Sequence, residues 1–223
     1  MLIDDRFQRP GFPYVATTNR LGGRQAALHL LEIGRRRPLV VTGPESFGCT
    51  RERRDGFIEV NAEAGIEIDR RRIVCGDFRF DCCRSAIALA VADGLEFDSV
   101  FAHNDHSAAA VLGALNEAGL WVPQDVAVVG FDDVEMASYT CPALTTVRQP
   151  MRETGEAAAR LLLDHTRIAG GGLLVHRSHQ PRRPRLDVMA GPGLTPARGR
   201  GQRLRAAEPA SHSFSPHSPH DPP

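Results

Sequence analysis

Lysine is absent from this chain of 223 residues, and so is any long apolar run. All 27 basic residues are arginines, and they balance 27 acidic residues, so the formal net charge is zero. A chain without excess basic charge carries no global field that would attract nucleic acid. No stretch reaches the length of a membrane-spanning helix, so no membrane partner is expected.

Cysteine is scarce as well. The five cysteines are an odd number without framework spacing, which predicts reduced thiols in a cytoplasm rather than a disulfide scaffold. Cys82 and Cys83 lack a second pair at zinc spacing, so packed thiols are favoured over a metal site. The first twenty residues include Asp4, Asp5 and Pro10 and hold no long apolar run, so no secretion signal is expected.

Charge and proline are unevenly distributed along the chain. Residues 1–175 hold 19 arginines against 24 acids, whereas residues 176–223 hold eight arginines against three acids and nine of the 16 prolines. A segment with so few apolar residues cannot bury a core. We therefore expect residues 176–223 to form a disordered tail. Its histidines, His212, His217 and His220, could bind metal adventitiously, but an unstructured tail is the simpler interpretation.

The most informative stretch runs from Val122 to Pro150. Its β-branched run at 126–129 is bounded by turn residues, which predicts a buried parallel strand. Gly130 ends that strand, and Phe131-Asp132-Asp133 follows at the edge where open α/β sheets bind their ligands.

Strand and helix patterns alternate along the chain. This alternation predicts βαβ units and a parallel sheet, hence an α/β fold. Strands are expected near 1–4, 14–17, 39–42, 73–75, 99–102, 126–129 and 144–147, and helices near 19–33, 51–65, 81–92 and 151–169.

Several motifs in this order and spacing resemble the effector-binding domain of the LacI/GalR family of transcription regulators. That resemblance implies a periplasmic-binding-protein-like (type I) fold, in which two lobes enclose a sugar or nucleoside. It is carried by Gly43-Pro44 with Arg53, Gly56 and Phe57; by Gly76-Asp77-Phe78; by Val100-Phe101-Ala102-His103-Asn104-Asp105; by Val122-Pro123 before Gly130-Phe131-Asp132; and by Leu144-Thr145-Thr146-Val147.

The resemblance also implies a domain organisation. Residues 19–147 correspond to a nearly complete C-terminal lobe, and residues 1–18 and 148–172 to remnants of the N-terminal lobe. The family's helix-turn-helix, its route to DNA, has no counterpart, which suggests an N-terminally truncated chain. After Val175 the family expects an apolar strand where this chain has Ser178–Arg185. A one-base shift can restore that strand, so we expect a frameshift near residue 176.

Asp132 and Arg53 are the first two candidate ligand residues. A carboxylate at the end of a strand can accept two hydroxyl hydrogen bonds, as a sugar requires. The alternative for Asp132 is capping the next helix, a role better suited to Asp133. Arg53 matches the family arginine that reaches the cleft and offers paired donors. The alternative is a solvated arginine in a charged first turn.

Three further candidates lie on one predicted strand and its end. By resemblance, Phe101 stacks on the ligand ring. Asn104 and Asp105 could each bind ligand or cap the following helix. Thr50 and Phe47 precede Arg53, and for them a ligand contact stays open.

The sequence therefore predicts a small-molecule effector-binding domain of a LacI/GalR-type regulator, without cofactor or metal. An enzyme is not expected, because His103 beside Asp105 lacks any nucleophile motif. The intact protein is expected to be a cytoplasmic homodimer. Two alternatives stay open: a periplasmic-type sugar-binding protein of a transporter, which would need a signal peptide, and an inactive gene fragment.

Overall fold

A six-stranded sheet forms the centre of the computed structural model, which describes residues 2–3, 14–15, 17–168 and 188–189. The strand order is β4-β3-β5-β6-β7-β8. The first five strands pair in parallel, and β8 joins β7 in the antiparallel direction. The predicted α/β fold with a parallel sheet is confirmed. The strands are β3 (Pro38–Thr42), β4 (Ile73–Cys75), β5 (Ser99–Ala102), β6 (Ala127–Asp132), β7 (Thr145–Arg148) and β8 (Val188–Met189).

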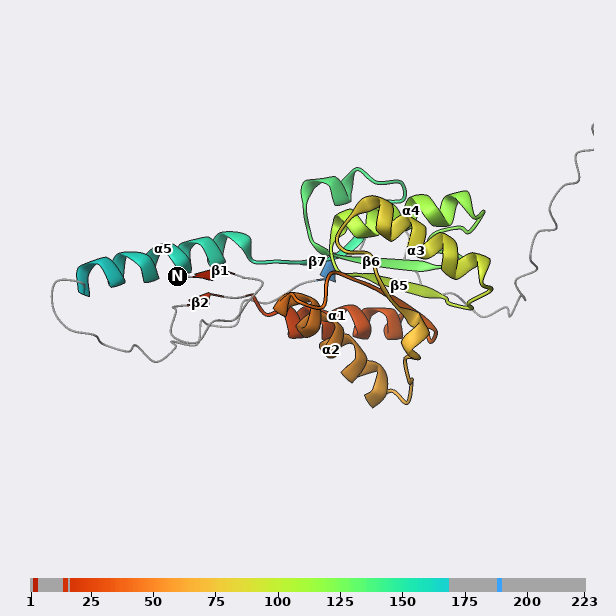
Figure 1. Ribbon diagram of the computed structural model, residues 1–223, viewed down its shortest axis with the longest axis horizontal. Helices are drawn as coiled ribbons and strands as arrows, with labels where there is room; N and C mark the ends of the chain where they lie inside the picture. The colour runs from red at the N-terminus through yellow and green to blue at the C-terminus, as the bar shows by residue number, and fades with distance from the viewer. Residues whose placement is uncertain (1, 4–13, 16, 169–187, 190–223) are drawn as a thin grey trace, which may run out of the picture.

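Helices cover both faces of this sheet (Figure 1). Helices α1 and α2 pack against each other on one face, and α3 and α4 on the other. Two short 3-10 helices, η1 and η2, precede β4 and follow β6. The bounds are α1 (Asn19–Glu32), α2 (Gly48–Glu63), α3 (Phe80–Ala92), α4 (Asp105–Glu117), η1 (Arg70–Arg72) and η2 (Glu135–Ser138).

Burial on both faces explains why the strands are almost uniformly apolar. Successive residues of a strand point to opposite faces. Leu39 and Val41 of β3 accordingly join the core under α3 and α4, whereas Val40 joins the core under α1 and α2. In β5, Val100 enters the first core and Phe101 the second. Because both faces of such a strand are buried, nearly every position favours an apolar side chain, and the sequence of the strand is a continuous hydrophobic run.

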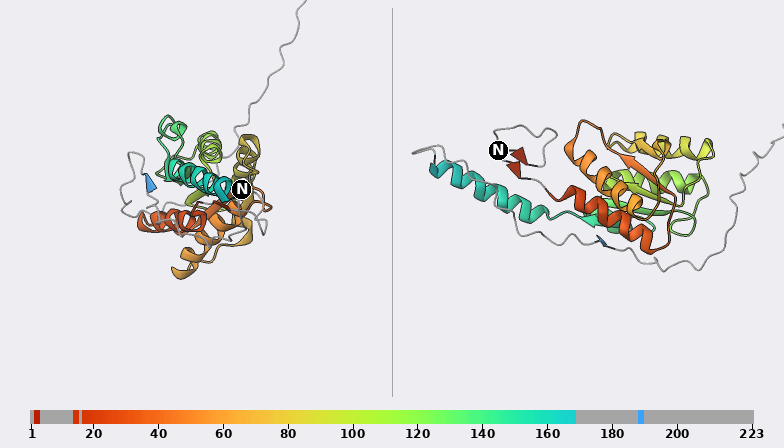
Figure 2. Two further views of the ribbon diagram at one scale, coloured as in Figure 1. Left: turned by 90° about the vertical axis from the view of Figure 1, so that its left-hand side faces the viewer. Right: turned by 90° about the horizontal axis from the view of Figure 1, so that it is seen from below.

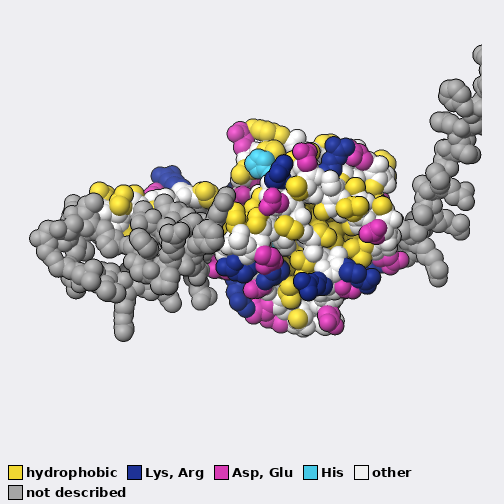
Figure 3. Space-filling model, in the orientation of Figure 1, with side chains coloured by type: hydrophobic (Ala, Val, Ile, Leu, Met, Phe, Trp, Pro, Cys, Tyr) yellow, Lys and Arg dark blue, Asp and Glu magenta, His cyan; other side chains and the backbone are white. Residues whose placement is uncertain are grey.

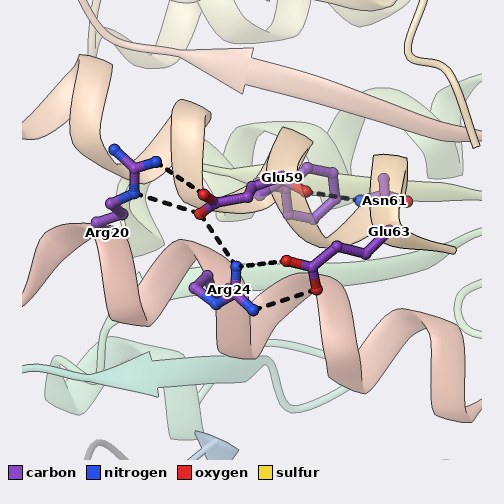
Figure 4. A network of polar contacts seen from close by, with 6 residues as sticks. Arg20, Arg24, Glu59, Asn61 and Glu63 are labelled. Atoms are coloured by element: carbon purple, nitrogen blue, oxygen red, sulfur yellow. Dashed lines mark hydrogen bonds and ion pairs between the residues drawn. The ribbon is translucent and has the colours of Figure 1, made fainter.

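Two glycines let α1 and α2 approach closely. A Cβ on Gly23 would lie 2.1 Å from the carbonyl oxygen of Arg53, and one on Gly56 would lie 2.0 Å from that of Arg20. Ion pairs from the two helices flank this contact (Figure 4). They are Arg20–Glu59 at 2.9 Å, Arg24–Glu59 at 3.0 Å and Arg24–Glu63 at 3.1 Å. Because these side chains are partly exposed to solvent, the ion pairs are expected to add little to the stability of the helix pair.

A second group of elements lies beyond the carboxyl end of β7. Helix α5 (Met151–Ile168) leaves from that end and runs away from the sheet, with β1 (Leu2–Ile3) and β2 (Tyr14–Val15) nearby (Figures 1 and 2). β1 and β2 pair in parallel, and α5 contacts β2. The assignment of 19–147 to a C-terminal lobe, and of 1–18 and 148–172 to remnants of an N-terminal lobe, stays a prediction.

The proposed disordered tail has one described exception. Val188 and Met189 form β8, paired with Val147 and Thr146, so the expectation that residues 176–223 lack regular structure is wrong at these two positions. The remainder of that segment, including the suspected frameshift and the tail histidines, lies outside the described residues. None of the helices in the described segments combines the length and the hydropathy that a bilayer span requires.

The cysteines carry free thiols, as the sequence predicted. Cys83 packs in the core between α3 and the sheet, and burial raises the pKa of its thiol. Cys82, its neighbour, is only partly buried. Within the described part of the chain, no cluster of three or more His, Cys, Asp or Glu side chains could hold a metal ion.

Candidate functional site

Polar side chains gather at the carboxyl edge of the sheet. The order of strands changes direction between β3 and β5, because β4 follows β3 on one side and β5 lies on the other. Ligands of open α/β sheets bind outside the carboxyl ends of strands at such a switch point. The segments that follow β3, β4, β5, β6 and β7 all meet at this edge because these strands are parallel.

The side chain of Arg53, from α2, lies at this switch point between β3 and β5. Its Nε donates to Oδ1 of Asn19 at 2.9 Å, and its Nη1 donates to the backbone oxygen of His103, just after β5. The guanidinium carbon lies 3.7 Å from the centroid of the Phe131 ring, and Nη1 lies 3.6 Å from Oδ1 of Asp132. Only 4% of the side chain is exposed. Arg53 is therefore a buried cation that ties α1, β5 and β6 together, and the solvated alternative does not apply.

Asp132 lies beside Arg53 but is more accessible, with 25% of its side chain exposed. Its Oδ1 accepts from Nε2 of Gln149 at 2.5 Å, and its backbone oxygen accepts from the Gln149 N–H at 3.3 Å. The structure thus brings the two leading candidates, Asp132 and Arg53, into one cluster and adds Gln149 to it. Sequence reasoning missed Gln149, although its place directly after β7 at the same edge could have signalled it.

The backbone around Asp132 is unusual. Asp132 has φ 115° and Asp133 has φ 59°, values that L residues rarely adopt. Asp133 does not cap a helix as expected. Its carboxylate accepts from Nε of Arg148 at 2.5 Å, and the N-cap of η2 is Val134, whose side chain makes no capping bond. Strain of this kind persists only where surrounding contacts impose it, and it clusters at functional sites.

Asn104 caps the following helix, whereas Asp105 makes buried contacts with neighbouring segments. Asn104 is the cap of α4, because its Oδ1 accepts from the N–H of Ser107 at 2.8 Å. Asp105 is fully buried; its Oδ2 accepts from the N–H of Val134 at 2.9 Å and its Oδ1 from Oγ1 of Thr146 at 2.5 Å. Burial raises the pKa of this carboxyl to about 6, and the nearby carboxylates of Asp132 and Asp133 also raise it.

Phe101 belongs to the core rather than to the exposed edge. It is fully buried and stacks on Phe57 of α2, with ring centroids 4.8 Å apart. The partly exposed aromatic side chains at this edge are Phe47 and Phe78, whose centroids lie 5.8 Å apart. Phe78 follows β4 with φ 55°, and its ring packs over Gly43 at the end of β3. Its position in the Gly76-Asp77-Phe78 motif, just past β4, is the sequence feature that places an aromatic side chain at this edge.

The side chains of His103 and Thr50 are buried, and their polar atoms have no hydrogen-bond partner among the described atoms. Both are 0% exposed, and neither the two ring nitrogens of His103 nor Oγ1 of Thr50 has a hydrogen-bond partner. Burial, together with the charge of Arg53, holds the pKa of His103 well below its usual range, so the ring is neutral. Asp105 bonds elsewhere, so the two do not form an acid–base pair.

The sequence and the fold both match known proteins. The family described as the periplasmic binding protein-like domain matches residues 27–188. The chain belongs to this family. Its relatives place it in the LacI/GalR branch of these periplasmic-binding-protein-like domains, as the motifs indicated.

Two curated relatives illustrate the likeness. The HTH-type transcriptional regulator CelR of Thermobifida fusca is 40% identical over 157 residues, covering 70% of this chain and 46% of CelR. The ribose operon repressor of Escherichia coli K12 is 39% identical over 143 residues, covering 64% of this chain and 43% of the repressor. The chain spans about half the length of the curated relatives it matches.

Solved structures agree with the sequence comparison. A CelR–cellobiose complex superposes with a TM-score of 0.68 at 38% identity, covering 74% of this chain and 51% of the other. A LacI-family regulatory protein from Chloroflexus aggregans gives 0.69 at 28% identity, covering 74% and 60%. These relatives are named as regulators and not as enzymes or transporter subunits, so the transporter alternative is not favoured.

Proposed function

We propose that this periplasmic-binding-protein-like domain binds the small-molecule effector of a LacI/GalR-type transcription regulator at the carboxyl edge of its sheet. The observation that carries the proposal is the cluster of Asp132, Arg53 and Gln149. A partly exposed carboxylate is held there by a buried cation and an amide.

The chemistry of the cluster favours a neutral, hydroxyl-rich ligand. The charges of Arg53 and Asp132 offset each other, so an anionic ligand would meet no surplus positive charge from this pair. A carboxylate can accept several hydrogen bonds at once, which suits the vicinal hydroxyls of a sugar or nucleoside. Oε1 of Gln149 is a buried acceptor without a partner among the described atoms, and it can accept from a further hydroxyl.

The aromatic pair supplies the apolar part of such a site. Phe47 and Phe78 lie after β3 and β4, at the same edge, and both rings are partly exposed. Sugar rings and nucleobases both present flat apolar faces that stack on aromatic side chains. We therefore carry Asp132, Gln149, Phe47 and Phe78 forward as contact residues and Arg53 as the group that positions Asp132. Phe101, Asn104 and Asp105 are not carried forward as contacts.

The relatives support the ligand class, the regulatory role and its partners. One is solved with cellobiose, and another is named for the ribose operon. Regulators of this type bind DNA through a helix-turn-helix, which the described residues do not contain, so DNA is proposed as a partner of the whole protein only. A homodimer in the cytoplasm is proposed for that protein on the same ground.

Titration calorimetry of the full chain against cellobiose, D-ribose and adenosine tests this function. We expect one of the three to bind and Asp132→Ala to weaken binding roughly 5- to 150-fold, because a ligand hydroxyl loses its acceptor in a partly dry site. Asp98→Ala, at the opposite edge of the sheet, serves as the matched control and should leave affinity unchanged. Absence of binding to all three, or equal affinity in the Asp132 variant, would contradict the proposal.

A further inference from the structure

Asp105 lies behind the effector site and contacts three parts of it. It is the first residue of α4, the helix that follows β5; it accepts from Thr146 in β7 at 2.5 Å and from the N–H of Val134 at 2.9 Å. It is fully buried. Its carboxylate therefore links the first residue of α4 to strand β7 and to the loop after β6.

The strand opposite Asp105 leaves room for its carboxylate. A Cβ on Gly130 of β6 would lie 2.4 Å from Oδ1 of Asp105, closer than any side chain tolerates. Gly130 is thus required by the close approach of this carboxylate, two residues before Asp132.

The bond to Val134 falls at the end of the strained segment. Asp132 and Asp133 have φ values of 115° and 59°, and Val134 is the next residue. Residues other than glycine rarely adopt such conformations, which persist only where neighbouring contacts impose them. From the β7 side, Gln149 donates a hydrogen bond to Asp132 and Arg148 donates one to Asp133. From the α4 side, the carboxylate of Asp105 accepts the N–H of Val134 and fixes the end of the segment.

We infer that Asp105 is a positioning residue that fixes the backbone of residues 132–134 and thereby sets the direction of the Asp132 carboxylate in the effector site. The inference rests on the proposed function for its effect on affinity, but its structural part can be tested without any ligand.

Amide hydrogen exchange of the full chain tests the structural part. Asp105→Ala removes the acceptor of the Val134 N–H and should speed exchange in a peptide covering 131–137 about tenfold. Asp105→Asn keeps an oxygen for Val134 and can donate its amide to Thr146, so exchange should stay near that of the wild type. Thr146→Val loses only one bond and should give an intermediate rate, which provides a reading if the alanine variant fails to fold.

Asp98 is the matched control for this experiment. It lies just before β5, and its carboxylate likewise accepts from backbone N–H groups, those of Arg36 and Arg37, and from the hydroxyl of Ser99. Asp98→Ala should speed exchange around residues 35–38 and leave 131–137 unchanged. If both variants change 131–137 equally, the effect is general destabilisation and the inference is overturned.

Affinity for cellobiose, with D-ribose and adenosine in parallel, completes the test. Asp105→Ala should weaken binding about tenfold, and Asp105→Asn should restore it to near the wild-type value. Faster exchange in 131–137 with unchanged affinity would refute the positioning role. If the wild type binds none of the three, the proposed function fails, and the exchange result alone decides whether Asp105 holds the segment.

Discussion

Both ends of strand β5 carry arginine and aspartate side chains, but the two ends differ in solvent exposure and in hydrogen-bond pairing. At its amino end, Asp98 accepts from the N–H groups of Arg36 and Arg37 at 2.9 and 3.0 Å, and Arg35 donates to the backbone oxygens of Pro123 and Asp125. These side chains are partly exposed and paired.

At the carboxyl end, the polar groups are buried and incompletely paired. Arg53, His103 and Asp105 have almost no exposed surface, both ring nitrogens of His103 lack partners, and the backbone at Asp132 has a positive φ. Buried polar groups are normally paired, and exceptions call for an explanation. This difference supports the effector site proposed at the carboxyl end, because unpaired buried groups are costly to the fold, whereas the groups at the amino end are paired.

The surface of the domain carries charges of both signs. On the face seen in Figure 3, arginine and acidic side chains lie next to one another over the body of the domain. The exposed ion pairs of the domain include Arg84–Glu117 at 2.7 Å and Arg37–Glu96 at 2.7 Å. Such pairs contribute little to stability. The buried ion pair of Arg53 with Asp132 is therefore the electrostatic feature with the largest expected effect.

Arg53→Ala is the strongest way to disturb the carboxyl end. It removes a buried cation together with its hydrogen bonds to Asn19 and the His103 carbonyl and its ion pair with Asp132, so we expect a loss of roughly 3 kcal/mol or more in the free energy of unfolding. Denaturant unfolding followed by circular dichroism measures it. Arg20→Ala, which removes an exposed arginine paired with Glu59 on the neighbouring helix pair, is the control and should change little. Equal effects of the two would mean that burial does not distinguish them.

The titration of Asp105 makes the stability of the carboxyl end of β5 depend on pH, which gives a second test of the comparison between the two ends. Its folded-state pKa of about 6 lies above the ordinary 3.8, because burial and the carboxylates of Asp132 and Asp133 disfavour its charge. Those carboxylates are in turn paired with Arg53 and Arg148. A raised pKa means that the contribution of Asp105 to stability is fully present below pH 4 and is lost as the pH rises through 6, by roughly 3 kcal/mol.

Asp105→Asn removes this titration. The difference in unfolding free energy between variant and wild type should therefore shift in favour of the variant between pH 4 and pH 7. Urea unfolding at four or five pH values measures it, and Asp98→Asn at the other end of β5 provides the comparison. A constant difference over this range would show that Asp105 has an ordinary pKa.

Much of the fold could be predicted because strand burial leaves a pattern in the sequence. The apolar run at 126–129 predicted a buried strand, and β6 confirms it, although the strand continues past Gly130, where the sequence predicted its end. The parallel arrangement then places Asp132 and Arg53 at one edge. What could not be predicted was decided by single-residue geometry. Asn104 caps α4 and Asp105 does not, although either type can cap. Phe101 is covered by Phe57, a contact between α2 and β5 that no local pattern contains.

His103→Phe is the subtlest test of the comparison. The ring of His103 lies 5.1 Å from that of Phe101, in an apolar environment on one side and beside Arg53 on the other. Its two nitrogens have no partner among the described atoms, so the neutral ring bears a desolvation cost without a compensating hydrogen bond. A phenyl ring of similar shape removes that cost, and we expect unchanged stability or a gain of about 1 kcal/mol. Thermal unfolding measures this change in stability.

Asn61→Leu is the matched control, because the buried Asn61 amide donates to the Phe57 carbonyl at 2.9 Å and its loss should destabilise the protein. If His103→Phe destabilises as much as Asn61→Leu, His103 is a satisfied structural residue, and the carboxyl end of β5 is no more costly to the fold than its amino end.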